Sequence, residues 1–257
     1  MAPTLYTVLA ASTLLTASLA APWRGNNGDY YPRYHHGSST SSASSCGPTD
    51  EVDTVEAVGT AETSQPQTWH QYTDDQLRTL APQMPTLEGL ASNTNVTLFA
   101  PALGIGNQNY TCNGTNFVQT ESASGATAQL YDLTELLMGG QTDVATIAQQ
   151  STTLRQQSSL PHLGLHYFSD DNVPVFNLTQ APGAPVLAGK KIGSVKAPAA
   201  EADIPWLFLL DAGNGVSKKL NTVYRIDTDK GVQDEMTCSE AGQVVERPYA
   251  AQYWFYY

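Results

Sequence analysis

The densest group of side chains that could carry out chemistry lies between His162 and Asp171. His162 and His166 are four residues apart, and Asp170 and Asp171 follow them. On an extended strand, residues four apart share a face, so the spacing permits a His/His/Asp metal or hydrolytic site. Gly164 and the proline before His162 disfavour the helix on which two histidines at this spacing usually hold a metal. We favour the simpler interpretation, in which His166 is buried and hydrogen-bonded and the two aspartates lie in a solvated turn.

Residues 103–109 begin like the glycine-rich fingerprint of a dinucleotide-binding site. Gly104 and Gly106 match its first two glycines, but Asn109 replaces the third, and a strand-like segment follows instead of a helix. Because that helix should bind the pyrophosphate, we predict a β-hairpin or bulge here and no nucleotide. The sequence also lacks a Gly-x-Ser-x-Gly elbow and a Cys-x-x-Cys motif, and residues 227–231 lack most ligands of a calcium loop. We therefore predict no cofactor and no metal site.

The sequence ends in a cluster of aromatic residues, Tyr249 and residues 253–257. On a strand they would alternate between two faces, one filling a core and the other showing tyrosines to solvent or to a sugar ligand. Core packing is the default expectation, and a sugar-binding surface is the alternative. The candidate ligand-binding residues of the chain are His166, Tyr167, Asp170 and Tyr253.

Short β-prone segments separated by Gly, Pro, Asn or Asp must position these side chains. This rhythm predicts a mainly β fold, an antiparallel β-sandwich or barrel with one or two short helices, rather than alternating strands and helices. A short helix is expected after the N-cap Thr73, ended by Pro82 and Pro85, and an amphipathic helix over 143–157 should lie across one sheet. The expected strands are residues 96–100, 109–112, 116–120, 126–133, 165–168, 173–178, 190–196, 204–210, 222–227 and 249–257.

Residues 1–20 have the pattern of a signal peptide. Residues 8–19 are mostly apolar but too few to span a bilayer, and Ser18-Leu19-Ala20 places small residues where a signal peptidase cleaves. No later stretch reaches spanning length without a charge or a proline, so we expect a secreted protein, extracellular or cell-wall associated, without a membrane span. Four Asn-x-Ser/Thr sites agree with that compartment, since each is a glycan acceptor that must face solvent. They begin at Asn95, Asn109, Asn113 and Asn177.

In an oxidising compartment two of the three cysteines should pair. Cys112 and Cys238 both lie in strand-like segments, whereas Cys46 follows a serine-rich tract. We therefore predict a Cys112–Cys238 disulfide, which closes a loop of more than a hundred residues. Pairing of Cys46 with one of these partners is the alternative.

The composition limits the class of protein. The 257 residues carry 12 Lys+Arg and 24 Asp+Glu, a net charge of −12, which argues against nucleic-acid binding because phosphates require clustered cations. Residues 21–67 contain almost no aliphatic side chains and are expected to form a disordered, serine-rich arm. Residues 68–257 are expected to form a single β-rich domain. The oligomeric state cannot be predicted from these features.

Six short motifs, taken in order, carry a family resemblance. They are residues 106–112, 130–132, 166–168 with 174–178, 204–207, 223–226 and 249–256. Together they resemble a family of unknown function that is common in secreted fungal proteins, and some of its members are labelled malate dehydrogenase. The resemblance covers residues 87–257, implies a β-rich secreted domain, is compatible with the Cys112–Cys238 pair, and brings no catalytic residues. The dehydrogenase label conflicts with the missing glycine fingerprint, so we do not adopt it.

Two hypotheses for the function follow. The leading one is a secreted, glycosylated, non-enzymatic β-domain at the cell surface or wall that binds a glycan or another extracellular component. The rival is a secreted hydrolase or metal-dependent enzyme that uses His166 with Asp170 or Asp171.

Overall fold

The computed structural model describes residues 71–120, 122–140, 142–157 and 160–257. The predicted signal peptide, the predicted arm and Cys46 lie outside the described residues. The described part is mainly β, as the sequence predicts, and its helices are short.

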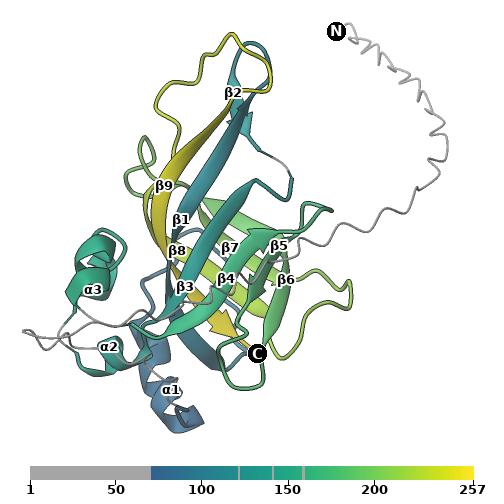
Figure 1. The fold of residues 1–257 in the computed structure, drawn as a ribbon. Coiled ribbons are helices and arrows are strands. Elements are labelled where there is room, and N and C mark those ends of the chain that lie inside the picture. The colour runs from purple at the N-terminus through teal and green to yellow at the C-terminus, as the bar shows by residue number, and fades with distance from the viewer. Residues whose placement is uncertain (1–70, 121, 141, 158–159) are drawn as a thin grey trace, which may run out of the picture. The chain divides into compact units, whose positions relative to one another are not determined.

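One antiparallel sheet contains all nine strands of the described part. The strand order is β2-β1-β3-β4-β5-β6-β7-β8-β9, and β9 also pairs with β1. Eight strands therefore close a barrel, and β2 pairs with the end of β1 outside the closed ring (Figure 1). Of the two predicted architectures, the chain adopts the barrel, which leaves its eight strands without a free edge. The strands are β1 (Leu98–Cys112), β2 (Phe117–Gln119), β3 (Ala126–Asp132), β4 (His162–Phe168), β5 (Pro174–Asn177), β6 (Val186–Val195), β7 (Trp206–Asp211), β8 (Thr222–Lys230) and β9 (Val244–Tyr256).

The short helices gather beside one wall of the barrel (Figure 1). In the described residues, no helix has both the length and the hydropathy needed to cross a bilayer. The α-helices are α1 (Asp74–Leu80), α2 (Thr134–Met138) and α3 (Ser151–Gln157), and the 3-10 helices are η1 (Ala81–Gln83) and η2 (Val144–Thr146).

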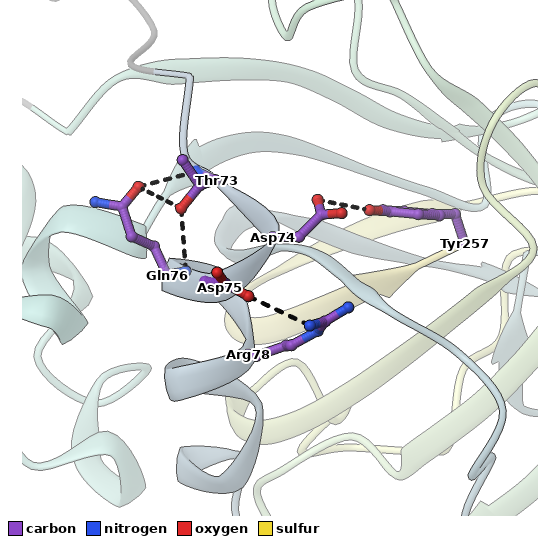
Figure 2. A network of polar contacts seen from close by, with 6 residues as sticks. All are labelled: Thr73, Asp74, Asp75, Gln76, Arg78 and Tyr257. Carbon is purple, nitrogen blue, oxygen red and sulfur yellow. Dashed lines mark hydrogen bonds and ion pairs between the residues drawn. The ribbon is translucent and has the colours of Figure 1, made fainter.

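Helix α1 begins where the sequence predicts. Figure 2 shows its capping box, in which the Thr73 hydroxyl accepts a hydrogen bond from the Gln76 backbone N–H at 3.3 Å, and Gln76 Oε1 accepts one from the Thr73 N–H at 2.9 Å. The same view shows the Tyr257 hydroxyl donating to Asp74 Oδ1 at 3.1 Å, which connects the helix to the last residue. The exposed Asp75–Arg78 ion pair, at 3.3 Å, contributes little to stability because water screens the two charges.

The single helix expected over residues 143–157 is wrong. The segment forms the short helix η2, then turns, then α3. Side chains of the barrel form hydrogen bonds with backbone groups that a continuous helix would pair internally. Asp227 Oδ2 accepts from the Ala148 N–H at 3.2 Å, and Gln252 Nε2 donates to the Val144 carbonyl. The segment is therefore fixed to β8 and β9 by side chains that its own sequence does not contain.

Two separate hydrophobic cores stabilise the fold. The barrel interior is filled by side chains such as Leu130, Phe176 and Tyr253. An outer core lies between the helices and the barrel wall and includes Leu80 and Trp254. Successive residues of β9 alternate between these two cores, so Tyr249 and residues 253–256 are at most 6% exposed. The expectation that the aromatic residues of the final strand pack in a core is therefore correct, and it holds for both faces of the strand.

Strand β1 is one continuous strand of 15 residues, whereas the sequence predicted two strands joined by a hairpin or bulge. Its glycines serve close packing rather than a turn. A Cβ on Gly104 would lie 2.3 Å from the Tyr253 ring, and a Cβ on Gly106 would lie 1.8 Å from the Thr127 carbonyl oxygen of β3. At these two positions β1 lies closer to its neighbours than a side chain would permit.

A disulfide joins Cys112 to Cys238, with their Cα atoms 6.0 Å apart. Cys112 is the last residue of β1, but Cys238 lies in the connection between β8 and β9 rather than in a strand. Cys112 packs with Tyr110 and Phe117 in a small apolar cluster, and the Tyr110 hydroxyl donates to the Gly231 carbonyl at 2.9 Å. This cluster and the disulfide hold the β8–β9 connection against the outer end of β1.

Candidate functional site

A cavity of about 550 Å³ opens inside one end of the barrel. Its volume falls within the range of small-molecule binding sites, roughly 300–1,000 Å³. Its lining comes from β4 to β9, the β4–β5 turn and the end of β2. The apolar lining residues are Phe168, Val173, Pro174, Phe176, Pro205, Leu207, Leu209 and Ala212. The polar and charged ones are Gln119, Thr120, His166, Asn172, Lys190, Lys191, Ser194, Arg225 and Tyr253, and Gly189 completes the wall.

A second hollow of about 430 Å³ lies between α1 and the C-terminal residue. Its wall includes Gln71, the first described residue, so its outline is incomplete. It contains none of the predicted site residues. The barrel cavity is the better candidate because strand residues form its wall and predicted site residues lie within it.

Strand alternation and register bring the cavity side chains together. On β8, Val223 belongs to the interior core and Tyr224 to the outer core, so Arg225 points inward. Arg225 is directly opposite Leu207 on β7 and Tyr253 on β9. Paired residues of neighbouring strands share a face, which places these three side chains around the same space.

The aromatic wall of the cavity is built around His166. Its ring is stacked on Phe176, with centroids 4.3 Å apart and planes inclined by 8°, and lies 5.9 Å from the Tyr253 ring. His166 Nδ1 is 3.0 Å from the Val175 carbonyl oxygen. Burial lowers the pKa of His166 to about 4, the Val175 hydrogen bond acts in the opposite direction, and the Arg225 charge lowers the pKa further. His166 is therefore neutral at neutral pH.

Two buried tyrosines lie next to each other here, Tyr253 in the cavity wall and Tyr249 behind it. The Tyr249 and Tyr253 hydroxyls are 2.9 Å apart, and both residues are at most 3% exposed. Burial raises the pKa of Tyr253, although the nearby Arg225 and the Tyr249 hydrogen bond lower it. Burial also raises the pKa of Tyr249 well above its usual value. Both phenols therefore stay protonated and neutral at neutral pH.

Arg225 is the charged residue deepest in the cavity wall. It is only 9% exposed, its Nη2 donates to the Pro205 carbonyl at 2.8 Å, and its Nε is buried without a hydrogen-bond partner. In the described part of the chain the ion pairs are Arg78–Asp75 and Arg247–Asp234, and none includes Arg225. A buried guanidinium without a counter-charge is energetically costly, so this position calls for an explanation.

The structure brings together only two of the four predicted ligand-binding residues. His166 and Tyr253 both line the cavity. Tyr167 follows His166 on β4 but is half-buried and absent from the cavity lining, and Asp170 is exposed in the β4–β5 turn with Asp171. The described residues contain no group of three or more His, Cys, Asp or Glu side chains that could hold a metal ion.

A β-bulge separates the two histidines. Opposite β3, Tyr131 pairs with His162 but Leu130 pairs with Gly164, so Leu163 is an extra residue in β4. The extra residue shifts the alternation of side chains between the two faces of β4. His162 is exposed on the outside of the barrel, with its Nε2 2.6 Å from Gln129 Oε1, whereas His166 is buried inside. The two histidines therefore do not share a face, and His166 is buried and hydrogen-bonded, as in the interpretation favoured from the sequence.

Sequence reasoning did not identify Arg225, Lys190 or Lys191 as site residues. Residues 224–227 alternate between aromatic or apolar and charged side chains, and an arginine in such a strand normally faces solvent. The signal that could have identified Arg225 was the expected fold, because one of the two faces of a barrel or sandwich strand lies in the interior.

The four Asn-x-Ser/Thr sequons differ in accessibility. Asn95 and Asn113 are exposed and Asn177 is half-buried. Asn109 is only 8% exposed, and its Nδ2 donates to the Ser124 carbonyl at 2.6 Å. Because a glycan must face solvent, the folded structure does not accommodate one at Asn109.

The fold and the cavity define the class of this protein: a closed antiparallel β-barrel domain with an internal cavity that contains a buried arginine. Residues 92–257 match the family described as "Protein of unknown function (DUF3455)", and the chain belongs to this family. The predicted resemblance to a family of unknown function is confirmed to that extent. No curated protein and no solved structure matches this chain.

Proposed function

We propose that this protein is a non-enzymatic binding protein whose barrel holds a small, partly apolar molecule in the cavity near His166. The observation that carries this proposal is the cavity of about 550 Å³ itself, which has an aromatic wall and opens at one end of the barrel. A neutral His166 stacked on Phe176 offers a flat, largely apolar surface to such a ligand.

The side chains of the cavity support binding rather than catalysis. Its described lining includes no Asp, Glu or Cys, so it lacks the carboxylate pairs and thiol nucleophiles of common hydrolases. The rival enzyme hypothesis needs Asp170 or Asp171 beside His166, but both aspartates are exposed and outside the lining. Metal analysis of the purified protein and of His166→Ala would test that rival, since stoichiometric metal lost in the variant would favour it.

The interior cavity also replaces the glycan-binding surface expected on the final strand. Of residues 249–257, all described, Tyr257 alone is exposed among the aromatic side chains, at 40%. A sugar platform needs several exposed rings, and this strand presents one. We therefore place the ligand inside the barrel.

We also propose an extracellular location. The signal-like residues 1–20, the exposed sequons at Asn95 and Asn113, the Cys112–Cys238 disulfide and the resemblance to secreted fungal proteins support it. N-terminal sequencing of protein recovered from culture medium tests this part: cleavage after Ala20 is expected, and intracellular protein that keeps residues 1–20 would contradict it.

Binding of N-phenyl-1-naphthylamine, a neutral fluorophore that brightens in apolar sites, tests the proposed cavity function. We expect saturable binding to the full chain. Leu207→Trp, whose larger side chain would fill the cavity, should weaken binding at least about tenfold. Ile192→Trp is the matched control, because Ile192 is 51% exposed and outside the lining. Unsaturable binding, or equal loss in both variants, would count against the proposal.

A further inference from the structure

The charged residues that line the cavity are all basic. Arg225, Lys190 and Lys191 line it, and no Asp or Glu belongs to the described lining. This arrangement stands out because acidic residues outnumber basic ones 24 to 12 in the whole chain. Three basic side chains without an acidic one in the described lining favour an anion as the ligand.

We propose that the natural ligand is an organic acid, with its carboxylate against Arg225 and its apolar body against the His166–Phe176 stack. This inference rests on the proposed binding function and specifies the chemical class of ligand. A single deeply placed guanidinium matches a single negative charge, and the apolar and aromatic lining matches a hydrocarbon or aromatic body.

A bound anion would explain why the buried charge of Arg225 is retained. Arginine has five N–H donors, and the Pro205 carbonyl accepts from Nη2 while Nε has no partner. A carboxylate in the cavity would accept from the guanidinium and supply the missing counter-charge in a site shielded from water. Because Arg225 is 9% exposed and His166 is neutral, the guanidinium is the charge that a ligand meets inside the barrel.

The two lysines have a different role at the opening. Both are exposed, and Lys191 pairs with Leu209, an interior residue, which directs Lys191 toward the cavity. Exposed charges act over a distance of about 8 Å at physiological salt and are screened as salt rises. The lysines should therefore attract the acid to the opening, while Arg225 holds it.

Competition between matched acids and alcohols tests the inference on the wild-type chain. N-phenyl-1-naphthylamine is the reporter, and decanoate against decanol and 2-naphthoate against 2-naphthalenemethanol are the competitor pairs. Each acid should displace the reporter at a concentration at least about tenfold lower than its alcohol, because charge-assisted hydrogen bonds are strong in a buried site.

Variants then assign the preference to Arg225. Arg225→Met should remove the preference for the acid, so that each acid and its alcohol displace the reporter at equal concentrations. Arg247→Met is the matched control, because it removes the same charge from a side chain that pairs with Asp234 and does not line the cavity. Lys190→Gln with Lys191→Gln should reduce only the part of acid binding that 0.5 M salt also removes.

The outcomes separate this inference from the proposed function. Equal displacement by acid and alcohol in the wild-type chain overturns the inference but leaves the binding function standing, and this comparison does not depend on whether Arg225→Met folds. A preference that survives in folded Arg225→Met also overturns it. Absence of saturable reporter binding overturns the binding function and the inference with it.

Discussion

The imidazole of His166 lies flat on the ring of Phe176, with centroids 4.3 Å apart and planes inclined by 8°. Both rings are inside the barrel, and His166 is 3% exposed. One face of this imidazole contacts an aromatic ring instead of water. Protonation would therefore place a poorly solvated cation in the interior. The stack therefore makes the fold sensitive to acid.

Acid should destabilise the protein through His166. Its folded-state pKa of about 4 lies below the unfolded value of 6.5, so the unfolded chain binds more protons between these values. Stability should fall as pH drops from about 6.5 to about 4, by up to about 3 kcal/mol from this residue, and the His166 contribution should not change further below that. Urea unfolding at a series of pH values measures the loss.

His166→Gln isolates this contribution, since glutamine does not titrate and can still donate to the Val175 carbonyl. The difference between wild type and variant should shrink as the pH falls below 6.5. His162→Gln is the control, because His162 is exposed and should account for much less of the slope. Parallel pH curves for wild type and His166→Gln would contradict the prediction.

Gly104→Ala should destabilise the barrel by about 1–3 kcal/mol, the usual penalty for overpacking a core. The added Cβ would lie 2.3 Å from the Tyr253 ring. Because the obstacle is a side chain, Tyr253→Leu should relieve it, and a double-mutant cycle should show a coupling of at least about 0.5 kcal/mol. Chemical denaturation of the four proteins gives this coupling.

Gly106→Ala is the matched comparison. Its Cβ would lie 1.8 Å from the backbone carbonyl oxygen of Thr127, which cannot move without disturbing β3. The substitution should destabilise at least as much as Gly104→Ala, and Tyr253→Leu should give no relief. Equal relief at both positions would mean that the Tyr253 contact is not what Gly104 protects.

These two glycines also show what the sequence could not reveal. Local alternation predicted most strands, but Gly104 and Gly106 read as a turn because nothing nearby indicates the ring and carbonyl that approach them. Barrel closure was equally hidden, since it depends on pairing between β1 and β9, such as Ala102 with Tyr253, which are far apart in the sequence. The strands were thus predictable, while their joining into a ring required long-range contacts.

The site was predictable only by residue type. His166 and Tyr253 were chosen because such side chains commonly bind ligands, and both line the cavity. Arg225 was missed because both faces of β8 are buried: Tyr224 packs under the helices, so alternation did not reveal which face was interior. The spacing that permitted His162 and His166 to share a face did not decide the outcome, because one extra residue in β4 turns His162 outward and a bulge has no clear sequence signal.

Reduction of the disulfide should lower stability by roughly 4–5 kcal/mol if loss of the cross-link in the unfolded chain dominates. Cys112 and Cys238 are separated by 126 residues, so the closed loop is long. Cys112→Ser with Cys238→Ser should reproduce the effect, as measured by chemical denaturation. Cys46→Ser should leave stability unchanged, because both sulfurs of the pair remain; a large effect of Cys46→Ser would contradict this assignment.

Glycans should occupy Asn113 but not Asn109 when the chain passes through a eukaryotic secretory pathway. Asn113 is exposed, and its Oδ1 accepts from the Thr115 N–H and hydroxyl, each at 3.1 Å, which orients the amide without using Nδ2. Asn109 Nδ2, the atom that would carry the sugar, instead donates to Ser124 in a buried position.

Glycopeptide mass spectrometry of the secreted, folded protein measures this difference directly. Asn113→Gln should remove one glycan without changing the unfolding transition, since that residue is at the surface. Asn109→Gln should remove no glycan but should destabilise the fold by about 1–3 kcal/mol, because it disturbs a buried amide that donates to the Ser124 carbonyl. A glycan found on Asn109 in folded protein would show that the end of β1 near the disulfide is more open than its hydrogen bonds indicate.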